Sequence, residues 1–158
     1  MPESSVVHHT FVIEKSFAKP PERVFAAFAD PAQKRRWFAE GLSHDVLSFE
    51  MDFREGGTES TKYRFKEGTP FPGVEFFSEA NYLDIVPDQR IVQASTMNFP
   101  GRRISAALVT YELLPEEGGG TTLICTHQAA FFEGSDGPQL REQGFQVLLA
   151  KLAEELAH

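Results

Sequence analysis

Cysteine, positive charge and long apolar runs are all scarce in this sequence. The 158 residues contain one cysteine, Cys125, so no disulfide can form within the chain, and we expect a reducing, cytoplasmic environment. Lys and Arg number 15 against 23 Asp and Glu, a formal net charge of −8. Nucleic-acid binding needs a concentrated cationic surface, so this balance argues against such a partner.

No stretch approaches the roughly 18 apolar residues of a membrane span. Residues 1–15 lack the basic and apolar segments of a secretory signal.

Metal-ligand patterns are also missing. His8 and His9 are adjacent at the start of an expected strand, so their side chains point to opposite faces. The other histidines, His44, His127 and His158, have no second His or Cys at ligand spacing, and we expect neither a metal nor a cofactor. Cys125 alternates with His127, but no Asn or Asp is placed to orient the imidazole. A buried cysteine acting as a small hydrophobe is therefore preferred to a thiol nucleophile.

Phenylalanine, in contrast, is abundant. The sequence contains 15 Phe, with 41% hydrophobic and 24% charged residues overall. This composition is typical of a globular protein, and the length fits one domain, residues 1–158, with a single sizeable core. So many Phe residues suggest an interior lined with aromatic rings.

The first forty residues predict one strand and two short helices. Residues 8–18 are rich in β-branched and aromatic residues and alternate like a strand. The segments 20–30 and 31–40 each carry proline where a first helical turn tolerates it, and Asp30 is placed to cap the second helix. The three cations of "QKRRWF" are interpreted as solvated charges on that helix.

Strand patterns dominate from residue 44 onward. The first strand places Leu47, Phe49, Met51 and Phe53 on one face, and the next, from residue 58, places Thr61, Tyr63 and Phe65 together. Further strand patterns follow through residues 74–86, 90–99, 102–114 and 121–131. The antiparallel order, with helices set apart from strands, predicts an α+β architecture.

The stretch "MDFREGGTES" between the first two of these strands raises the question of a phosphate-binding loop. Such a loop would run from a strand into the N-terminus of a helix. Here the glycines join two alternating strands, and Glu55 and Glu59 would repel a phosphate. We therefore predict that Gly56 and Gly57 form a hairpin turn.

The C-terminal residues predict a long amphipathic helix. Pro138 lies in its expected first turn, with Ser135 or Asp136 as the N-cap. The apolar stripe comprises Phe145, Leu148, Leu149, Leu152 and Leu156. A strongly curved sheet of about six to seven strands can wrap around this helix and leave a pocket between them.

Four segments, in this order, resemble a known family: "PPERVFAAFADPAQKRRWF", "DFREGG", "GGGTTLICTH" and "GFQVLLAKLAEEL". They resemble the START-like (Bet v 1-like, SRPBCC) helix-grip superfamily, and within it the family of the activator of the Hsp90 ATPase. Gly144 and Phe145 stand where that family more commonly has Gly-Trp. The resemblance implies a curved antiparallel sheet around the C-terminal helix. Its superfamily includes lipid and hormone carriers, co-chaperone domains and cyclase-like enzymes.

Three functions remain open at this point. We favour non-enzymatic binding of a hydrophobic or amphipathic small molecule, because ligand pockets are mostly apolar with few polar groups. An Hsp90-type chaperone partner is the alternative that the family implies. A cyclase- or isomerase-like enzyme is a third, with His127 as the candidate catalytic residue beside Tyr63 and an acid such as Glu112. A monomer or a homodimer is expected. The expected ligand-binding residues are Trp37, Phe38, Phe49, Met51, Tyr63, Phe65, Tyr82, Met97, His127, Phe131 and Phe145.

Overall fold

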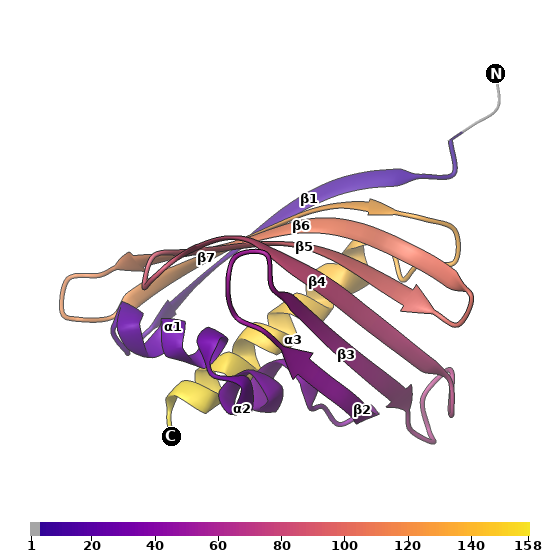
Figure 1. Cartoon of the computed structure of the whole chain (residues 1–158), viewed down its shortest axis with the longest axis horizontal. Helices are drawn as coiled ribbons and strands as arrows, with labels where there is room; N and C mark the ends of the chain where they lie inside the picture. Colours follow the sequence, from indigo (N-terminus) through magenta and orange to yellow (C-terminus); the bar gives the residue numbers. More distant parts are fainter. Residues whose placement is uncertain (1–3) are drawn as a thin grey trace.

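The computed structural model describes residues 4–158 and contains one curved, seven-stranded antiparallel sheet with helices on its concave side (Figure 1). The strand order is β1-β7-β6-β5-β4-β3-β2, so β1 and β2 are the two edges. The elements are β1 (Val7–Phe17), α1 (Pro21–Ala29), α2 (Pro31–Lys34), η1 (Arg35–Ala39), β2 (His44–Met51), β3 (Thr58–Phe65), β4 (Glu75–Val86), β5 (Arg90–Phe99), β6 (Arg102–Pro115), β7 (Thr121–Phe131) and α3 (Pro138–Leu156).

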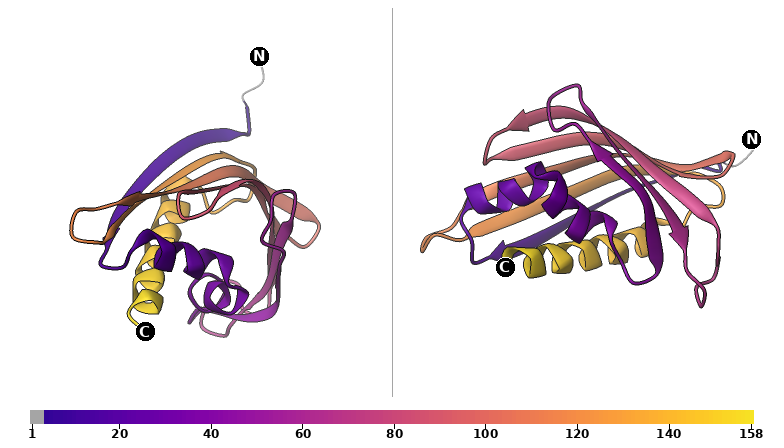
Figure 2. Two further views of the ribbon diagram at one scale, coloured as in Figure 1. Left: turned by 60° about the vertical axis from the view of Figure 1, so that its left-hand side comes forward. Right: turned by 60° about the horizontal axis from the view of Figure 1, so that its bottom comes forward.

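The sheet arches over the long helix α3, and α1 and α2 lie near the C-terminal end of that helix (Figure 2). This arrangement confirms the predicted helix-grip α+β fold, including the two short helices after the first strand. None of the helices in the described part of the chain combines the length and apolar character needed to span a membrane.

The apolar stripe of α3 packs as its periodicity predicts. Leu149, Leu152 and Leu156 are buried against the inner face of the sheet and the short helices, and Phe145 and Leu148 pack beside them. The expected N-cap is wrong, because Gly137, with φ of 85°, caps the helix without a side-chain bond. Ser135 and Asp136 are engaged elsewhere, since the Ser135 hydroxyl accepts from the Gly137 N–H and the Asp136 carboxylate binds Arg141.

The second short helix begins as predicted but buries one of its three cations. Asp30 Oδ1 accepts a hydrogen bond of 3.1 Å from the Ala32 N–H, which confirms the cap. The last part of the helix, η1, is a π-helical turn closed by a 3.0 Å bond from the Glu40 N–H to the Arg35 carbonyl. Lys34 is only 1% exposed. The interpretation of all three cations as solvated is therefore wrong for Lys34, which lies one turn before the buried Trp37 and points inward with it.

Strand β2 contains a bulge that the alternating pattern does not show. The pairing with β3 shifts between Val46 and Ser48, and Leu47 is 38% exposed. Because an extra residue reverses the alternation, Val46 and Phe49 both lie opposite inward-facing residues of β3. The expectation that Leu47 shares a face with Phe49 and Met51 is thus wrong.

The Gly56-Gly57 hairpin is confirmed as a strand-to-strand turn. It joins β2 to β3, and Gly56 has φ of 82°, a conformation that favours glycine. A Cβ at Gly57 would collide with the backbone carbonyl oxygens of Asp52 and Arg54. The glycines are therefore required by the turn itself.

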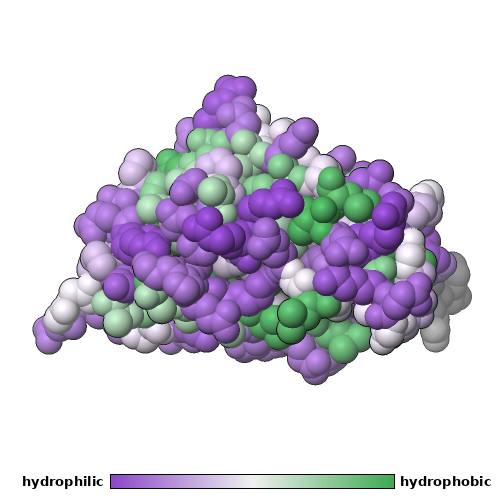
Figure 3. Space-filling view, turned by 90° about the horizontal axis from the view of Figure 1, so that it is seen from below, coloured by the Kyte–Doolittle hydropathy of each residue, from purple (hydrophilic) through white to green (hydrophobic). Residues whose placement is uncertain are grey.

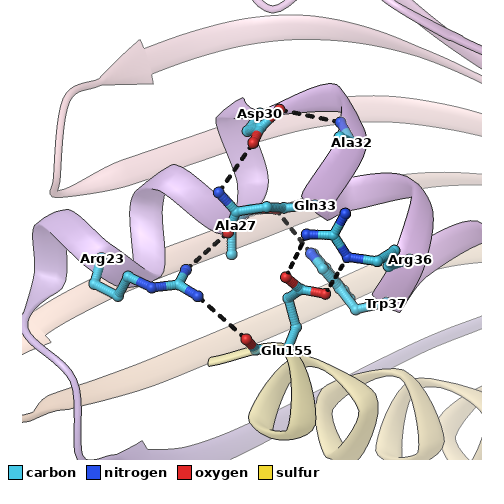
Figure 4. A network of polar contacts seen from close by, with 8 residues as sticks. All are labelled: Arg23, Ala27, Asp30, Ala32, Gln33, Arg36, Trp37 and Glu155. Atoms are coloured by element: carbon cyan, nitrogen blue, oxygen red, sulfur yellow. Dashed lines mark hydrogen bonds and ion pairs between the residues drawn. The ribbon is translucent and has the colours of Figure 1, made fainter. Parts of the chain in front are cut away.

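A polar network holds the short helices against the last turn of α3 (Figure 4). The Arg36 guanidinium donates two hydrogen bonds of 2.8 Å to the Glu155 carboxylate, and Arg23 donates to the Glu155 carbonyl. The Trp37 indole N–H donates to the Ala27 carbonyl at 2.8 Å, which ties η1 to α1. These contacts close one end of the space between sheet and helix.

Candidate functional site

A cavity of about 290 Å³ lies between the inner face of the sheet and α3. Small inward-facing side chains on three neighbouring strands, β4 to β6, leave this space: Ser78, Ala80, Ser95 and Ser105. The opposite wall comes from α3 and includes Leu140, Gly144, Phe145 and Leu148. The cavity thus arises where the sheet presents small residues to the helix.

A second cavity of about 580 Å³ adjoins the first toward the hairpin that carries Phe71. Five residues line both cavities: Phe76, Met97, Asp136, Leu140 and Arg141. Of the second cavity's lining, Phe71 and Leu140 are exposed. The face of the molecule that carries α3 shows such apolar surface among mostly hydrophilic residues (Figure 3).

Two buried polar side chains face the first cavity without a partner in the described chain. Gln93 is 4% exposed and His127 is 1% exposed, and neither Gln93 Oε1 nor His127 Nδ1 has a hydrogen-bond partner. Gln93 pairs with Val109 and Val109 pairs with His127, so both lie in one row across β5, β6 and β7. Buried polar atoms normally find partners, so these two atoms are available to bond a molecule in the cavity.

Aromatic rings surround the His127 imidazole. It stacks on Phe11 with ring centroids 4.6 Å apart, and Phe145 packs edge-on at 4.9 Å. Burial, with a smaller contribution from the nearby Arg141 charge, lowers the pKa of His127 to about 4. The ring is therefore neutral at physiological pH, with one nitrogen that donates and one that accepts.

A buried ion pair forms one end of the first cavity. Lys34 Nζ lies 2.9 Å from Glu59 Oε1, and the Tyr82 hydroxyl donates to the same oxygen at 2.5 Å. Glu59 is 3% exposed and lines the cavity. The Lys34 ammonium also lies over aromatic faces, nearest the Phe38 ring at 4.5 Å from its centroid. Burial, followed by the Glu59 charge, raises the pKa of Tyr82, so the phenol keeps its proton.

Arg141 lines both cavities and is bound by neighbouring groups through Nε and Nη2. It donates to both Asp136 oxygens, at 2.8 Å each, and its Nη2 donates to the Ser105 hydroxyl at 3.0 Å. Its guanidinium also lies 5.2 Å from the centroid of the Phe131 ring. Like Lys34, this cation is neutralised by a carboxylate within the protein.

Five of the expected binding residues line the first cavity: Phe38, Tyr63, Met97, His127 and Phe145. Tyr63 stacks on Phe76 with centroids 4.5 Å apart, and burial raises its pKa, so it presents a neutral phenol. His44, a residue outside the expected set, also lines this cavity and bonds through Nε2 to the Ala39 carbonyl. Phe65 and Met97 line the second cavity.

The other five expected residues do not line either cavity. Trp37 is held in the core by its bond to Ala27, and the Tyr82 hydroxyl is bound by Glu59. Phe131 is buried beside His127 and Arg141. Phe49 and Met51 lie on edge strand β2, opposite Thr61 and Glu59.

The prediction of Glu112 as an acid beside His127 is wrong. Glu112 alternates with the buried residues Tyr111 and Leu113, so it lies on the outer face of β6. Among the residues that the structure describes, no carboxylate bonds to His127, and no three His, Cys, Asp or Glu side chains gather as a metal site. Cys125 is buried on the same strand, and burial raises the pKa of its thiol to about 12.

Among the residues that the sequence prediction missed are four polar or charged ones: Lys34, Glu59, Gln93 and Arg141. A signal existed for two of them. Glu59 alternates with Thr61 and Tyr63, and Gln93 alternates with Ile91, so each shares the inward face of its strand. Charge and polarity suggested a surface position instead. For Lys34 and Arg141 the helix pattern alone does not distinguish a buried cation from a solvated one.

Comparison with known proteins agrees with this architecture. Residues 18–157 match the family described as activator of Hsp90 ATPase homolog 1-like protein. A protein from Rhizobium loti is 45% identical, with 96% of this chain and 99% of that chain covered and a TM-score of 0.84. An uncharacterised protein from Rhizobium leguminosarum is 37% identical, with 97% of each chain covered and a TM-score of 0.88.

More distant structures share the fold. An AHSA1-like protein from Aeromonas hydrophila is 21% identical over 94% of this chain and 92% of its own, with a TM-score of 0.68. None of the curated proteins matches the chain. The family match covers six of the seven strands, β2 to β7, and all of the helices, and the chain therefore belongs to the activator of Hsp90 ATPase homolog 1-like family.

Proposed function

We propose that this protein binds a hydrophobic or amphipathic small molecule, without chemically changing it, in the cavity between the sheet and α3. The observation that carries the proposal is the pair Gln93 and His127, buried and unpartnered, on the wall of a largely apolar cavity. Binding sites for small molecules typically combine apolar walls with a few polar groups that fix orientation. The adjoining second cavity gives a longer ligand further room.

The chemistry of the cavity supports binding over catalysis. A general base needs an orienting partner and a pKa near the working pH, whereas His127 bonds to no carboxylate in the described chain and burial lowers its pKa to about 4. The buried Cys125 thiol, with its pKa raised to about 12, is a poor nucleophile. If a substrate is found, a His127→Gln variant that keeps full turnover would dismiss His127 as the catalytic residue of a cyclase- or isomerase-like enzyme.

A cavity-filling variant tests the proposal. Ser95 lines the floor of the first cavity and makes no side-chain hydrogen bond in the described chain, so Ser95→Leu places an apolar side chain in that space. Ala94→Leu, the adjacent residue on the outer face of β5, is the matched control. The probe is N-phenyl-1-naphthylamine, a neutral fluorophore that brightens in apolar surroundings.

We expect the wild type and Ala94→Leu to bind this probe with the same affinity. We expect Ser95→Leu to bind at least ten-fold more weakly while its melting temperature stays close to that of the wild type. Equal binding by all three proteins would place the probe elsewhere, and absence of binding to the wild type would count against a ligand cavity.

A second candidate function follows from the family itself. Its name denotes activation of the Hsp90 ATPase, so we propose regulation of an Hsp90-type chaperone as the alternative. Addition of the purified protein to the Hsp90 homologue of the same cell, with ATP hydrolysis as the readout, tests it. Unchanged hydrolysis at a saturating excess would dismiss this alternative and leave the ligand-binding proposal intact.

A further inference from the structure

We propose that the ligand of the first cavity is an uncharged molecule that carries a hydrogen-bonding group, rather than an anion such as a fatty acid. This inference rests on the proposed function and specifies its ligand class. It follows from which polar groups around the cavity are already paired and which are free.

The cations near the cavity are neutralised within the protein. Lys34 pairs with Glu59 at 2.9 Å, with side chains 1% and 3% exposed. Arg141, the one Lys or Arg among the described lining residues of this cavity, is bound by both oxygens of Asp136 and by Ser105. A carboxylate that entered would have to compete with one of these internal acids for its cation, and it would lose its own hydration in doing so.

The remaining charged groups lie outside the first cavity or are screened by solvent. Glu79 alternates with the inward-facing Ser78 and Ala80, so its exposed carboxylate lies on the outer face of β4. Arg102 lines only the second cavity and is exposed, so solvent screens its charge. Among the described residues, the lining of the first cavity therefore offers an anion no cation that lacks an acidic partner.

The unpartnered groups, in contrast, are neutral. Gln93 is an amide, and His127 stays uncharged because burial disfavours its protonated form. Both flank Val109 in one row of the sheet, two strand spacings apart, which is about 10 Å between their backbones. A hydroxyl or amide group on the ligand, placed over Val109, can bond either side chain while its apolar part lies toward Phe145 and Met97.

Three matched compounds test this ligand class by isothermal titration calorimetry at pH 7. 4-Butylphenol is neutral and can hydrogen-bond, butylbenzene is neutral and cannot, and 4-butylbenzoate is an anion of similar shape. We expect 4-butylphenol to bind about ten-fold more tightly than butylbenzene, the difference that one buried hydrogen bond makes. We expect 4-butylbenzoate to bind most weakly.

Two variants assign the preference to the proposed groups. Gln93→Leu and His127→Phe should each reduce the preference for 4-butylphenol over butylbenzene, and the double variant should abolish it. Gln128→Leu makes the same chemical change on the outer face of β7 and should leave the preference unchanged.

The outcomes separate this inference from the proposed function. Equal binding of 4-butylphenol and butylbenzene would overturn the inference and leave a purely apolar cavity site. Binding of 4-butylbenzoate as tight as that of the phenol would also overturn it. Binding of none of the three compounds would contradict both the ligand class and the proposed function.

Discussion

The buried pair Lys34–Glu59 imposes the strictest local constraint in the site. Moving two charges out of water costs several kcal/mol, and their attraction repays this only with good geometry and further bonds. Here the Tyr82 hydroxyl supplies a further bond to Glu59, and the Phe38, Trp37 and Phe28 rings lie near the ammonium. The pair joins the end of α2 to β3, and so holds the following turn η1, which carries Phe38, at the cavity wall.

Removal of one partner should therefore be costly. Lys34→Met leaves the Glu59 carboxylate buried without its cation, and we expect a loss of about 3–5 kcal/mol in the free energy of unfolding. For a chain of this size that corresponds to a melting temperature on the order of 10 °C lower. Urea unfolding measures the change, and Arg35→Met, at an exposed ion pair on the same turn, should change stability by less than about 0.5 kcal/mol.

The double variant Lys34→Met with Glu59→Gln provides the control. The amide removes the uncompensated charge and still accepts from Tyr82, so most of the lost stability should return. A single variant Lys34→Met as stable as the wild type would show that the ion pair does not hold η1 in place.

His127 should make the fold less stable as the pH falls. Its pKa is about 4 in the folded protein and 6.5 when unfolded. Between these two pH values His127 is protonated in the unfolded chain but not in the folded protein. The free energy of unfolding therefore decreases as the pH falls from about 6.5 to about 4. At pH 5 this group alone should cost about 2 kcal/mol relative to pH 7.5.

His127→Phe keeps the stacking with Phe11 and removes the titration. We expect the variant to lose about 2 kcal/mol less than the wild type between pH 7.5 and pH 5, measured by urea unfolding at both values. An identical pH dependence in the two proteins would mean that His127 takes up its proton in the folded state as readily as in the unfolded one.

Sequence reasoning predicted several aromatic residues of the cavity wall but missed most of its polar residues. Phe38, Tyr63 and Phe145 were predictable because aromatic side chains at inward-facing positions are usually buried between the sheet and the helices. Lys34 and Glu59 were not, because each looks like a surface charge until its partner, 25 residues away, is known. Pairing across such a separation is a property of the folded structure.

At the scale of elements, alternation and helical periodicity determine most of what is observed. The stripe on α3 and the inward rows of β3, β5 and β6 follow directly from the sequence pattern. The bulge in β2 does not, since one extra residue at Leu47 leaves no compositional mark. The same limit explains the misplaced N-cap, because Ser135 and Asp136 have the right chemistry but other partners.

Two glycines at helix α3 give opposite predictions. Gly144 has helical geometry, and an added Cβ meets nothing within 4 Å, so Gly144→Ala should stabilise the protein by about 1 kcal/mol. Gly137 has φ of 85°, so Gly137→Ala should destabilise it by about 1 kcal/mol although space is available. In thermal unfolding, the melting temperature should be roughly 2–4 °C higher for Gly144→Ala and roughly 2–4 °C lower for Gly137→Ala. A loss of stability in Gly144→Ala would contradict the open space found around a Cβ at this position.

At the scale of the whole molecule, the cavity results from the mismatch between a curved sheet and a straight helix. The helix contacts the sheet through Leu149, Leu152 and Leu156 near its C-terminal end, where the Arg36–Glu155 bonds also hold it (Figure 4). Toward its N-terminal end the sheet presents Ser78, Ser95 and Ser105, and the space stays unfilled. The order of elements in the sequence predicts this architecture, but the size of the space depends on the distance between helix and sheet, which no local pattern encodes.

The most direct test of a ligand site in this space is to map binding on the ¹⁵N-labelled protein by NMR, with 4-butylphenol as the ligand. We predict that the largest amide shift changes occur at Gln93, Ser95 and Val109 on the inner face and at Phe145 on α3. Leu108 and Gln128, on the outer face, should move little. Shift changes confined to the outer face, or none at millimolar ligand, would contradict the account.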